Sequence, residues 1–509
     1  MRHLIISFAL ILFANQIDAQ PGSLDLTFGG IGYVTTKLSV NDKCYALAIQ
    51  NDQKIVAVGC AVGDNIDFAT VRYNTNGTVD SSFGTNGRII TPVLPFYVDI
   101  ARAVAIQTNG KILVAGESSS GSISDFSIIR YNLNGTLDSS FGTGGEVTVD
   151  LNNTVDMVRS LALQSDGKII VIGYAFTSTV PDIGIIRCNS DGSLDNTFGT
   201  NGRVITHLGN SSTHTQTECV VIQPDGKIIV ATNPTISNCD FTLLRYNSNG
   251  SLDSTFGVNG IAYTNLANSY TYYSFNVALQ IDGKIIVSGN FSGNPNYGFC
   301  VARFNPDGLL DSLFGTLGLV MTTFALPAQG YGMTFDNDGK IIIVGGSDGQ
   351  SPNSGFALAR YDTVGTLDST FGSNGTICMY FGYGHNDCGR KVAIQNDNKI
   401  VVAGTDLDPD LGSNFAIARF NSVPLGAHEF VLEDRFNIYP NPTTGRMKID
   451  CLNKEIQEIS IFNIIGNLLL QVQCDKERSE IDISTLAIGM YIIKVTGADW
   501  TVQKKIIKE

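Results

Sequence analysis

The chain has 509 residues, of which 43% are hydrophobic and 16% are charged, so it is long enough to bury more than one core. Its formal net charge of −14 at pH 7 argues against a nucleic-acid-binding surface, because such a surface must be basic to neutralise phosphates. The 54 glycines against 14 prolines indicate many tight turns, and the ten cysteines follow no regular spacing that would form a disulfide framework.

The first residues are predicted to be a secretion signal rather than part of the fold. Arg2 and His3 precede an apolar run over residues 4–14, and the small residue Ala19 follows a short polar stretch. This order is typical of a secretory signal peptide, and the run is too short to cross about 30 Å of hydrocarbon. We therefore expect residues 1–19 to be removed, so that the mature protein begins at Gln20, is exported and does not span a membrane.

Residues 22–421 repeat one pattern seven times. Each repeat contains a motif of the form Leu/Val-Asp-x-x-Phe-Gly, and successive motifs are 55 to 58 residues apart. A turn resembling Gln-x-Asp-Gly-Lys also recurs seven times, as does an arginine that an aromatic residue follows in every repeat but one, where Cys188 follows Arg187. The aspartates of the motif are Asp25, Asp80, Asp138, Asp195, Asp253, Asp311 and Asp368. A fixed period of this length predicts a repeat architecture.

Each repeat is predicted to contain four short strands. In the second repeat these are residues 88–91, 101–107, 111–115 and 126–131, which are rich in β-branched residues and bounded by Gly, Asn and Asp. The third strand of every repeat is apolar on both faces, so other sheets must cover both. Seven four-stranded units of this kind suit a closed ring, an all-β seven-bladed β-propeller. An open solenoid would need distinct polar end repeats, whereas the end repeats here resemble the middle ones.

The repeated motifs resemble those of the delta-60 repeat family, tandem β-propeller repeats of large bacterial surface and secreted proteins. The resemblance covers the whole array, which we place in a domain over residues 20–421. It implies a fold and a location. It implies no reaction, because the family has no established common activity.

A different pattern begins after the array. Residues 422–435 are predicted to be a linker, and alternating strands over residues 436–509 predict a small immunoglobulin-like β-sandwich. This segment resembles the C-terminal sorting domain of the type IX secretion system of Bacteroidota-type bacteria. The matching residues are Tyr439, Pro440, Asn441, Pro442, Gly445, Gly466, Gly489, Met490, Tyr491, Lys504, Lys505, Ile506 and Ile507. The resemblance implies a partner, the type IX secretion machinery, and removal of the segment from about Phe436 onward during or after export.

No residue is assigned a catalytic, cofactor-binding or metal-binding role. The repeated aspartates are expected to hold their own turns, because a catalytic pair needs two carboxylates in different environments. Ser347 lies in a Gly-x-Ser-x-Gly sequence, but no helix is predicted after it, as a nucleophile elbow requires. Asp406, Asp408 and Asp410 alternate as in a calcium loop, but the glycine comes one place late and no glutamate closes the loop. A solvated acidic loop is favoured there.

Export permits disulfides, and two cysteine pairs are candidates. Counting outward from the turn between Gln50 and Lys54 places Cys44 opposite Cys60 on neighbouring strands. Cys378 and Cys388 flank one connection between strands. The sequence leaves the connectivity open.

The lengths of the connections predict the two faces of the ring. The Gln-to-Lys turn and the link of eight residues from each arginine to the next aspartate keep constant lengths, so they lie together on one face. Arg419 and Asp25 have no such partner along the chain, and a closed ring brings them together. The loops of variable length lie on the other face, the usual place for recognition. Their aromatic candidates, which either bind a partner or pack the loops, are Tyr270, Tyr272, Tyr273, Tyr297, Tyr380, Phe381, Tyr383 and His385.

The favoured interpretation is a secreted or cell-surface propeller that binds a protein or a glycan without catalysis and without a cofactor. One alternative is a secreted propeller hydrolase or lyase whose site is built from non-repeated loops. Another is a structural component of a surface layer. The Asp-box of sialidase-type propellers needs a tryptophan in the repeats, but the single tryptophan, Trp500, lies outside them, which argues against that kind of enzyme.

Overall fold

The computed structural model describes residues 20–93, 98–151, 154–176, 181–208, 216–233, 241–264, 270–293, 297–347, 355–381, 387–408, 412–423, 436–451, 456–463, 468–476, 478–487, 489–496 and 501–509. Every regular element in these residues is a β-strand. No helix in the described part of the chain is long and apolar enough to cross a membrane. The chain divides into two compact units, one spanning Ala19–Val423 and the other containing Pro424–Glu509.

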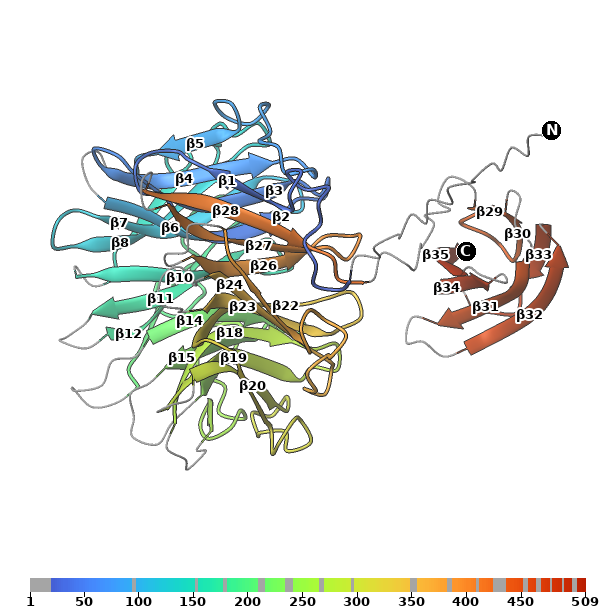
Figure 1. The fold of residues 1–509 in the computed structure, drawn as a ribbon. Coiled ribbons are helices and arrows are strands. Elements are labelled where there is room, and N and C mark those ends of the chain that lie inside the picture. Colours follow the sequence, from blue (N-terminus) through green and yellow to red (C-terminus); the bar gives the residue numbers. More distant parts are fainter. Residues whose placement is uncertain are drawn as a thin grey trace, which may run out of the picture. The chain divides into compact units, whose positions relative to one another are not determined.

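The larger unit is the seven-bladed β-propeller, and each blade has four strands that pair antiparallel (Figure 1). A single parallel bridge between Ile66 and Val98 joins the first two blades into one continuous sheet. The first three blades are β2 (Lys43–Ile49), β3 (Ile55–Val62), β4 (Ile66–Tyr73) and β5 (Arg88–Thr91); β6 (Val98–Ile106), β7 (Ile112–Ser119), β8 (Ser124–Tyr131) and β9 (Glu146–Val149); and β10 (Asp156–Leu163), β11 (Ile169–Phe176), β12 (Pro181–Cys188) and β13 (Arg203–Thr206).

The fourth to sixth blades follow the same order. They are β14 (Gln216–Ile222), β15 (Ile228–Asn233), β16 (Thr242–Tyr246) and β17 (Ile261–Tyr263); β18 (Thr271–Leu279), β19 (Ile285–Ser292), β20 (Tyr297–Phe304) and β21 (Leu319–Thr323); and β22 (Ala328–Phe335), β23 (Ile341–Ser347), β24 (Gly355–Tyr361) and β25 (Thr376–Met379). The seventh blade consists of β26 (Cys388–Ile394), β27 (Ile400–Asp408), β28 (Gly412–Phe420) and the N-terminal strand β1 (Tyr33–Thr36).

The sequence repeat and the blade are offset by one strand. The first strand of a repeat, such as β5, pairs with the last strand of the preceding repeat, here β4. The first repeat therefore contributes β1 to β28, and the two ends of the array lie side by side in Figure 1. Arg419 Nε lies 2.8 Å from Asp25 Oδ2, which confirms the predicted contact between the ends of the array.

The repeated arginine and aspartate form a buried ion pair in every blade. In the first blade Arg72 Nε lies 2.7 Å from Asp80 Oδ2, and Lys54 Nζ lies 3.0 Å from the same oxygen. The other oxygen of Asp80 accepts a hydrogen bond from the backbone N–H of Ser82, so the aspartate holds its own turn as expected. The Arg72 Nη1 donates to the carbonyl of Leu133 in the next blade. The motif thus fixes both the turn and the blade junction.

The hydrophobic core lies between adjacent blades. The second strand of each blade is almost wholly buried, as in β3 and β7, which agrees with its apolar sequence on both faces. Where the ring closes, Val401 and Phe415 of the seventh blade pack with Ile55 and Val71 of the first. Each such side chain contributes roughly 1.5–3 kcal/mol of burial free energy. Ring closure is therefore favourable, because it covers apolar faces of the first and seventh blades that an open array would expose to water.

The smaller unit has two sheets with a common core. One sheet has the order β29 (Phe436–Tyr439), β30 (Arg446–Cys451) and β33 (Arg478–Asp482). The other has the order β32 (Leu468–Lys476), β31 (Ile456–Asn463), β34 (Gly489–Thr496) and β35 (Thr501–Lys508). Met447 and Ile449 of the first sheet pack against Ile459 and Ile493 of the second, as in a β-sandwich.

The predicted opposition of Cys44 and Cys60 is wrong by one residue. A bulge in β2 shifts the register, so Cys60 pairs with Lys43 and Cys44 pairs with Gly59. Among the described residues, neither Cys44 and Cys60 nor Cys378 and Cys388 form a disulfide.

Candidate functional site

The first strand of every blade carries a β-bulge at the same place. In β6, for example, Ala101 pairs with Gly116 and Ala103 pairs with Ala115, so Arg102 is the extra residue. A bulge leaves its extra residue outside the regular pairing and re-aims its side chain. The extra residues of the seven blades are Tyr45, Arg102, Arg159, Glu218, Phe275, Tyr331 and Arg390, which we call the bulge ring.

A glycine opposite the bulge gives the strand room to bend. A Cβ atom on Gly289 would lie 1.7 Å from the carbonyl oxygen of Tyr273, and one on Gly116 would lie 2.0 Å from that of Ile100. Glycine occupies this position in six blades, and Thr232 occupies it in the fourth, where the described residues do not explain how it fits. Glycine is required here because a carbonyl group of the neighbouring strand approaches closely, and not because the backbone adopts a positive φ angle.

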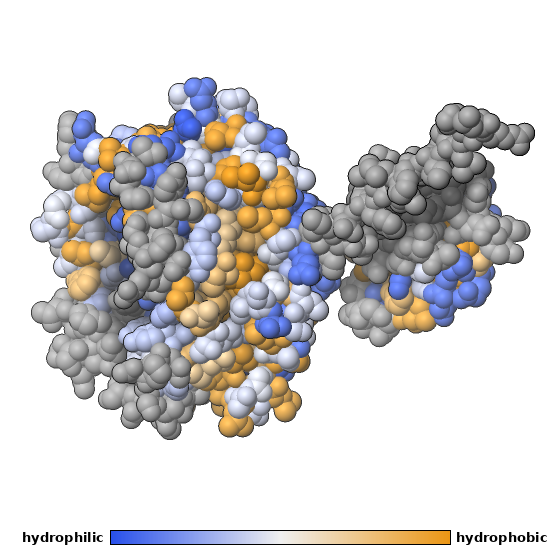
Figure 2. Space-filling model, in the orientation of Figure 1, coloured by the Kyte–Doolittle hydropathy of each residue, from blue (hydrophilic) through white to orange (hydrophobic). Residues whose placement is uncertain are grey.

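The bulge ring lines a cavity on the axis of the propeller. The cavity has a volume of ≈ 640 Å³, and residues from the first strands of all seven blades line it. This volume lies within the range of about 300–1,000 Å³ that is common for small-ligand sites. On the face visible in Figure 2, by contrast, the described hydrophobic and hydrophilic residues of the propeller are interspersed.

Positive charge dominates the cavity. Its lining includes four basic residues, Arg102, Arg159, Arg390 and Lys391, and a single carboxylate, that of Glu218. Arg102 donates two hydrogen bonds to Glu117, at 2.9 and 2.7 Å, and Arg159 Nε lies 3.9 Å from Glu218. Within the described residues, no carboxylate oxygen lies within 4.0 Å of Arg390 or Lys391. Two cations of the seventh blade are therefore left for a ligand to neutralise.

Aromatic rings hold the arginines in place. The guanidinium of Arg102 lies 4.5 Å from the centre of the Tyr45 ring, and that of Arg390 lies 4.3 Å from the centre of the Tyr331 ring. Phe275 packs edge-on against Tyr331, with the ring centres 5.3 Å apart. Stacking of this kind orders an arginine while its N–H groups stay available to an oxyanion.

Glu218 is the group in the cavity whose charge changes near neutral pH. Burial raises its pKa from 4.5 to about 7, although Arg159 and Arg102 act in the opposite direction. The folded state therefore binds more protons than the unfolded chain between these two pH values.

Replacing Glu218 with Gln is expected to remove a pH dependence of stability. Because the pKa is raised on folding, the favourable contribution is complete below the unfolded pKa and is lost as pH rises through the folded one. Glu218 by itself should lower wild-type stability by up to about 3 kcal/mol between pH 4.5 and 7, and Glu218→Gln should remove that part of the pH dependence. Denaturant unfolding of both proteins at several pH values measures this pH dependence of the free energy of unfolding. Parallel slopes in the two proteins would contradict the raised pKa.

The aromatic candidates of the variable loops divide into two groups. Tyr272, which lies in β18, and Phe381 are buried, and they pack against Phe241 and Phe356 respectively. Exposed side chains remain at Tyr273, Tyr297 and Tyr380. Tyr270 contacts the rings of Tyr272 and Phe291, and Tyr383 and His385 lie outside the described residues.

Three other residues that were predicted to lie in loops, Asp406, Asp408 and Ser347, belong to strands. Asp406 and Asp408 lie in β27, and Asp406 is buried, so the prediction of a solvated acidic loop is wrong there; Asp410 lies outside the described residues. Burial raises the pKa of Asp406. Ser347 ends β23 with its hydroxyl buried, which is unlike the exposed nucleophile of an elbow.

Comparison with solved structures finds likenesses of low identity. A protein of unknown function from Dyadobacter fermentans is 9% identical, covers 77% of this chain and 98% of its own, and has a TM-score of 0.43. A polysaccharide lyase of family PL25, an ulvan lyase bound to -[GlcA(1-4)Rha3S]-, is 11% identical, with coverages of 77% and 97% and a TM-score of 0.46. The polysaccharide lyase Uly1 is 11% identical, with coverages of 80% and 96% and a TM-score of 0.44. At these TM-scores the likenesses say nothing about the chemistry of this chain, and no curated protein matches it.

Two family models match the chain. The model described as "Domain of unknown function (DUF5122) beta-propeller" matches residues 50–83, 107–141, 164–198, 223–256, 280–314, 337–371 and 395–423, one match in each repeat. The model described as "Secretion system C-terminal sorting domain" matches residues 437–509. That domain marks proteins exported by the type IX system to the cell surface or the medium. The chain is therefore an exported β-propeller with seven repeats that match the DUF5122 model, followed by a C-terminal secretion sorting domain.

Proposed function

We propose that the propeller is the ligand-binding part of this exported protein and that its axial cavity binds an acidic saccharide without catalysis. The observation that carries the proposal is the charge of the lining, in which Arg390 and Lys391 have no carboxylate within 4.0 Å among the described residues, in a chain whose net charge is −14. A concave site lined with one sign of charge concentrates ligands of the opposite sign. The ligand is therefore anionic.

The side chains of the cavity suit a carboxylated or sulfated sugar. The planar guanidinium of Arg390 can hold an oxyanion through two parallel hydrogen bonds, and Lys391 adds a second charge beside it. Phe275 and Tyr331 offer apolar surface against which a sugar ring can pack. Asn276 and Ser160 add polar groups to the same lining.

In this proposal the rest of the chain serves delivery. Residues 1–19 are a signal peptide, residues 20–421 bind the ligand, and residues 422–435 are a linker. Residues 436–509 direct the chain to the type IX secretion machinery and are then removed. The ligand-binding part is left in the medium or on the outer surface.

The proposal is tested by calorimetric titration of the full-length chain with defined oligomers. Trigalacturonate and a chondroitin sulfate tetrasaccharide are the acidic probes, cellotetraose is the neutral one, and a tetraglutamate peptide separates saccharide from peptide. Binding of an acidic saccharide is expected, with affinity that falls as salt rises. Arg390→Gln should weaken it by tenfold or more, and Arg88→Gln, which changes an exposed arginine on β5, should not. Binding of the peptide alone, or binding indifferent to Arg390→Gln, would contradict the proposal.

A second candidate is catalysis, and Glu218 is the observation that favours it. A carboxyl group with a pKa of about 7 in a cavity can take up and release a proton at neutral pH. The same oligosaccharides, incubated with the protein and analysed by mass spectrometry, decide between the two. Products that disappear in Glu218→Gln would support a hydrolase or lyase. Intact oligosaccharides that are nevertheless bound would support a binding protein.

A further inference from the structure

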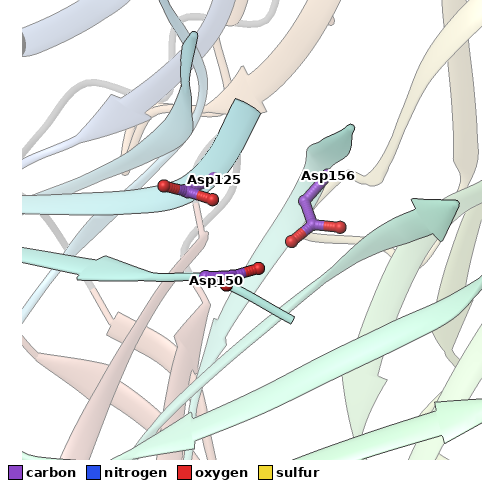
Figure 3. Close-up of side chains that lie close together, drawn as sticks. All are labelled: Asp125, Asp150 and Asp156. Atoms are coloured by element: carbon purple, nitrogen blue, oxygen red, sulfur yellow. The ribbon is translucent and has the colours of Figure 1, made fainter. Parts of the chain in front are cut away.

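Three aspartates converge at the junction of the second and third blades (Figure 3). Asp125 lies in β8, Asp150 directly follows β9, and Asp156 begins β10. One carboxylate oxygen of each lies within 4.8 Å of the corresponding oxygens of the other two. Two blades therefore contribute acidic side chains to one point.

The cluster lacks compensation for its buried charge. Asp156 is 0% exposed, and although its Oδ2 accepts a hydrogen bond from the Leu151 N–H at 2.8 Å, its Oδ1 has no partner within the described residues. Asp125 Oδ1 is also buried without a hydrogen bond in the described part of the chain. A buried carboxylate oxygen without a partner is costly, and neighbouring carboxylates repel each other. A cation between the three would satisfy both oxygens and offset the repulsion.

The other blade junctions provide an internal comparison. At the first junction Asp67 and Asp99 occupy the places of Asp125 and Asp156, but Pro92 stands where Asp150 would be. At the third junction Asp182 instead has a basic partner, with its Oδ1 2.8 Å from His207 Nδ1. In the sequence, no other junction has acidic residues at all three places. The third carboxylate is thus a local addition to the repeat and not a requirement of the blade.

We propose that Asp125, Asp150 and Asp156 bind a calcium ion. Calcium takes six to eight oxygen ligands at about 2.3–2.6 Å, so two oxygens on opposite sides of one ion lie about 4.8 Å apart. The three carboxylates fit around such an ion as they stand. Their oxygen donors favour calcium over zinc, which prefers nitrogen and sulfur. Because the chain is exported, the ion need bind only with a Kd of roughly 10⁻⁴–10⁻³ M, as in extracellular modules.

The ion ties the second blade to the third where β10 begins. Ser124 already makes one link across this junction, because its Oγ donates to the backbone carbonyl of Asp156 at 2.8 Å. Calcium adds a link through the side chains of Asp125 and Asp150. Its binding is therefore expected to stabilise the folded propeller, since a ligand that binds only the folded state raises the melting temperature.

The test uses the full-length chain stripped with EGTA and titrated with calcium chloride. Calorimetry should give a Kd of roughly 10⁻⁴–10⁻³ M, and 10 mM calcium should raise the melting temperature by about 2–5 °C. Asp156→Asn should abolish both responses. Without calcium, this variant should melt no lower than the wild type, because it removes one of three mutually repelling charges. That result separates loss of the site from failure to fold.

Asp67→Asn is the control matched to Asp125→Asn, since Asp67 occupies the place of Asp125 at the junction that has no third carboxylate. It should keep the calcium response of the wild type. The proposal would be overturned if calorimetry detected no heat of calcium binding and 10 mM calcium left the melting temperature unchanged. It would also be overturned by a response that survives in both Asp125→Asn and Asp156→Asn, or by one that Asp67→Asn removes equally, because calcium would then act through general surface charge.

Discussion

Replacing Arg419 with methionine is expected to lower the free energy of unfolding of the propeller by about 3–5 kcal/mol, because it breaks a buried ion pair. Arg419 Nε lies 2.8 Å from Asp25 Oδ2, and its guanidinium lies 4.8 Å from the centre of the Phe28 ring. Asp25 is 3% exposed and would keep only Lys399, at 3.4 Å, as an ionic partner. Chemical denaturation of the two proteins measures the difference.

The effect of Arg419→Met should depend on pH. Burial raises the pKa of Asp25, but Thr27, Arg419 and Lys399 outweigh it and hold the pKa below its ordinary value of 3.8. A pKa lowered on folding contributes stability above the unfolded pKa and loses it as pH falls toward the folded one. The difference between wild type and variant should therefore shrink below pH 3.8.

Arg245→Met is the matched control for ring closure. Arg245 makes the same contacts, with its Nε 2.7 Å from Asp253 and its guanidinium 4.5 Å from the centre of the Phe256 ring, but its aspartate follows eight residues later in the chain, so this pair does not join the two ends of the array. The two variants should lose similar stability. Hydrogen exchange of the β1 amides should accelerate in Arg419→Met and stay unchanged in Arg245→Met. Equal protection of β1 in both would contradict a role for Arg419 in holding the ring closed.

The propeller could be predicted because its defining contacts are local and repeated. Each arginine lies eight residues before its aspartate, as in Arg72 and Asp80, so the pair appears directly in the sequence. The one pair broken by the chain ends, Arg419 and Asp25, then indicated a closed ring. The offset between repeat and blade could not be predicted from the sequence, because the composition of β5 does not reveal which neighbouring strand it pairs with.

The bulge ring could not be predicted from pattern alone. One inserted residue changes no composition, yet it turns Tyr45 out of the pairing and moves Cys60 from Cys44 to Lys43. A signal was nevertheless present. The bulge residue always lies five positions before the first residue of the Gln-x-Asp-Gly-Lys turn, as Arg102 does before Gln107, and it is often charged within an otherwise apolar strand.

The acidic cluster depends on contacts between blades, which sequence spacing does not reveal. Asp125 and Asp156 are far apart in the chain and belong to different blades. They meet because the last strands of one blade lie beside the first strand of the next. The alternation of Asp406 and Asp408, by contrast, is visible in the sequence because both residues lie in one strand.

Replacing Gly289 with threonine is expected to destabilise the propeller by about 3 kcal/mol, through overpacking of a tightly packed site. The new Cβ would lie 1.7 Å from the carbonyl oxygen of Tyr273, so the backbone of β18 would have to move. That carbonyl lies two residues before Phe275 of the bulge ring, so the movement reaches the cavity. A lower denaturation midpoint is therefore expected together with weaker binding of the acidic saccharide.

Gly63→Thr is the control for this substitution. Gly63 lies in the turn between β3 and β4, and the nearest heavy atom to a Cβ built there, the Asn65 carbonyl oxygen, is 4.0 Å away. The same side chain should therefore change stability there by no more than about 0.5 kcal/mol. If Gly289→Thr and Gly63→Thr were equally well tolerated, the close approach of strand and carbonyl would not be what requires glycine opposite the bulge. The bulge would then be caused by closure of the ring, because the first strand of each blade must bend toward the axis, and not by the glycine opposite it.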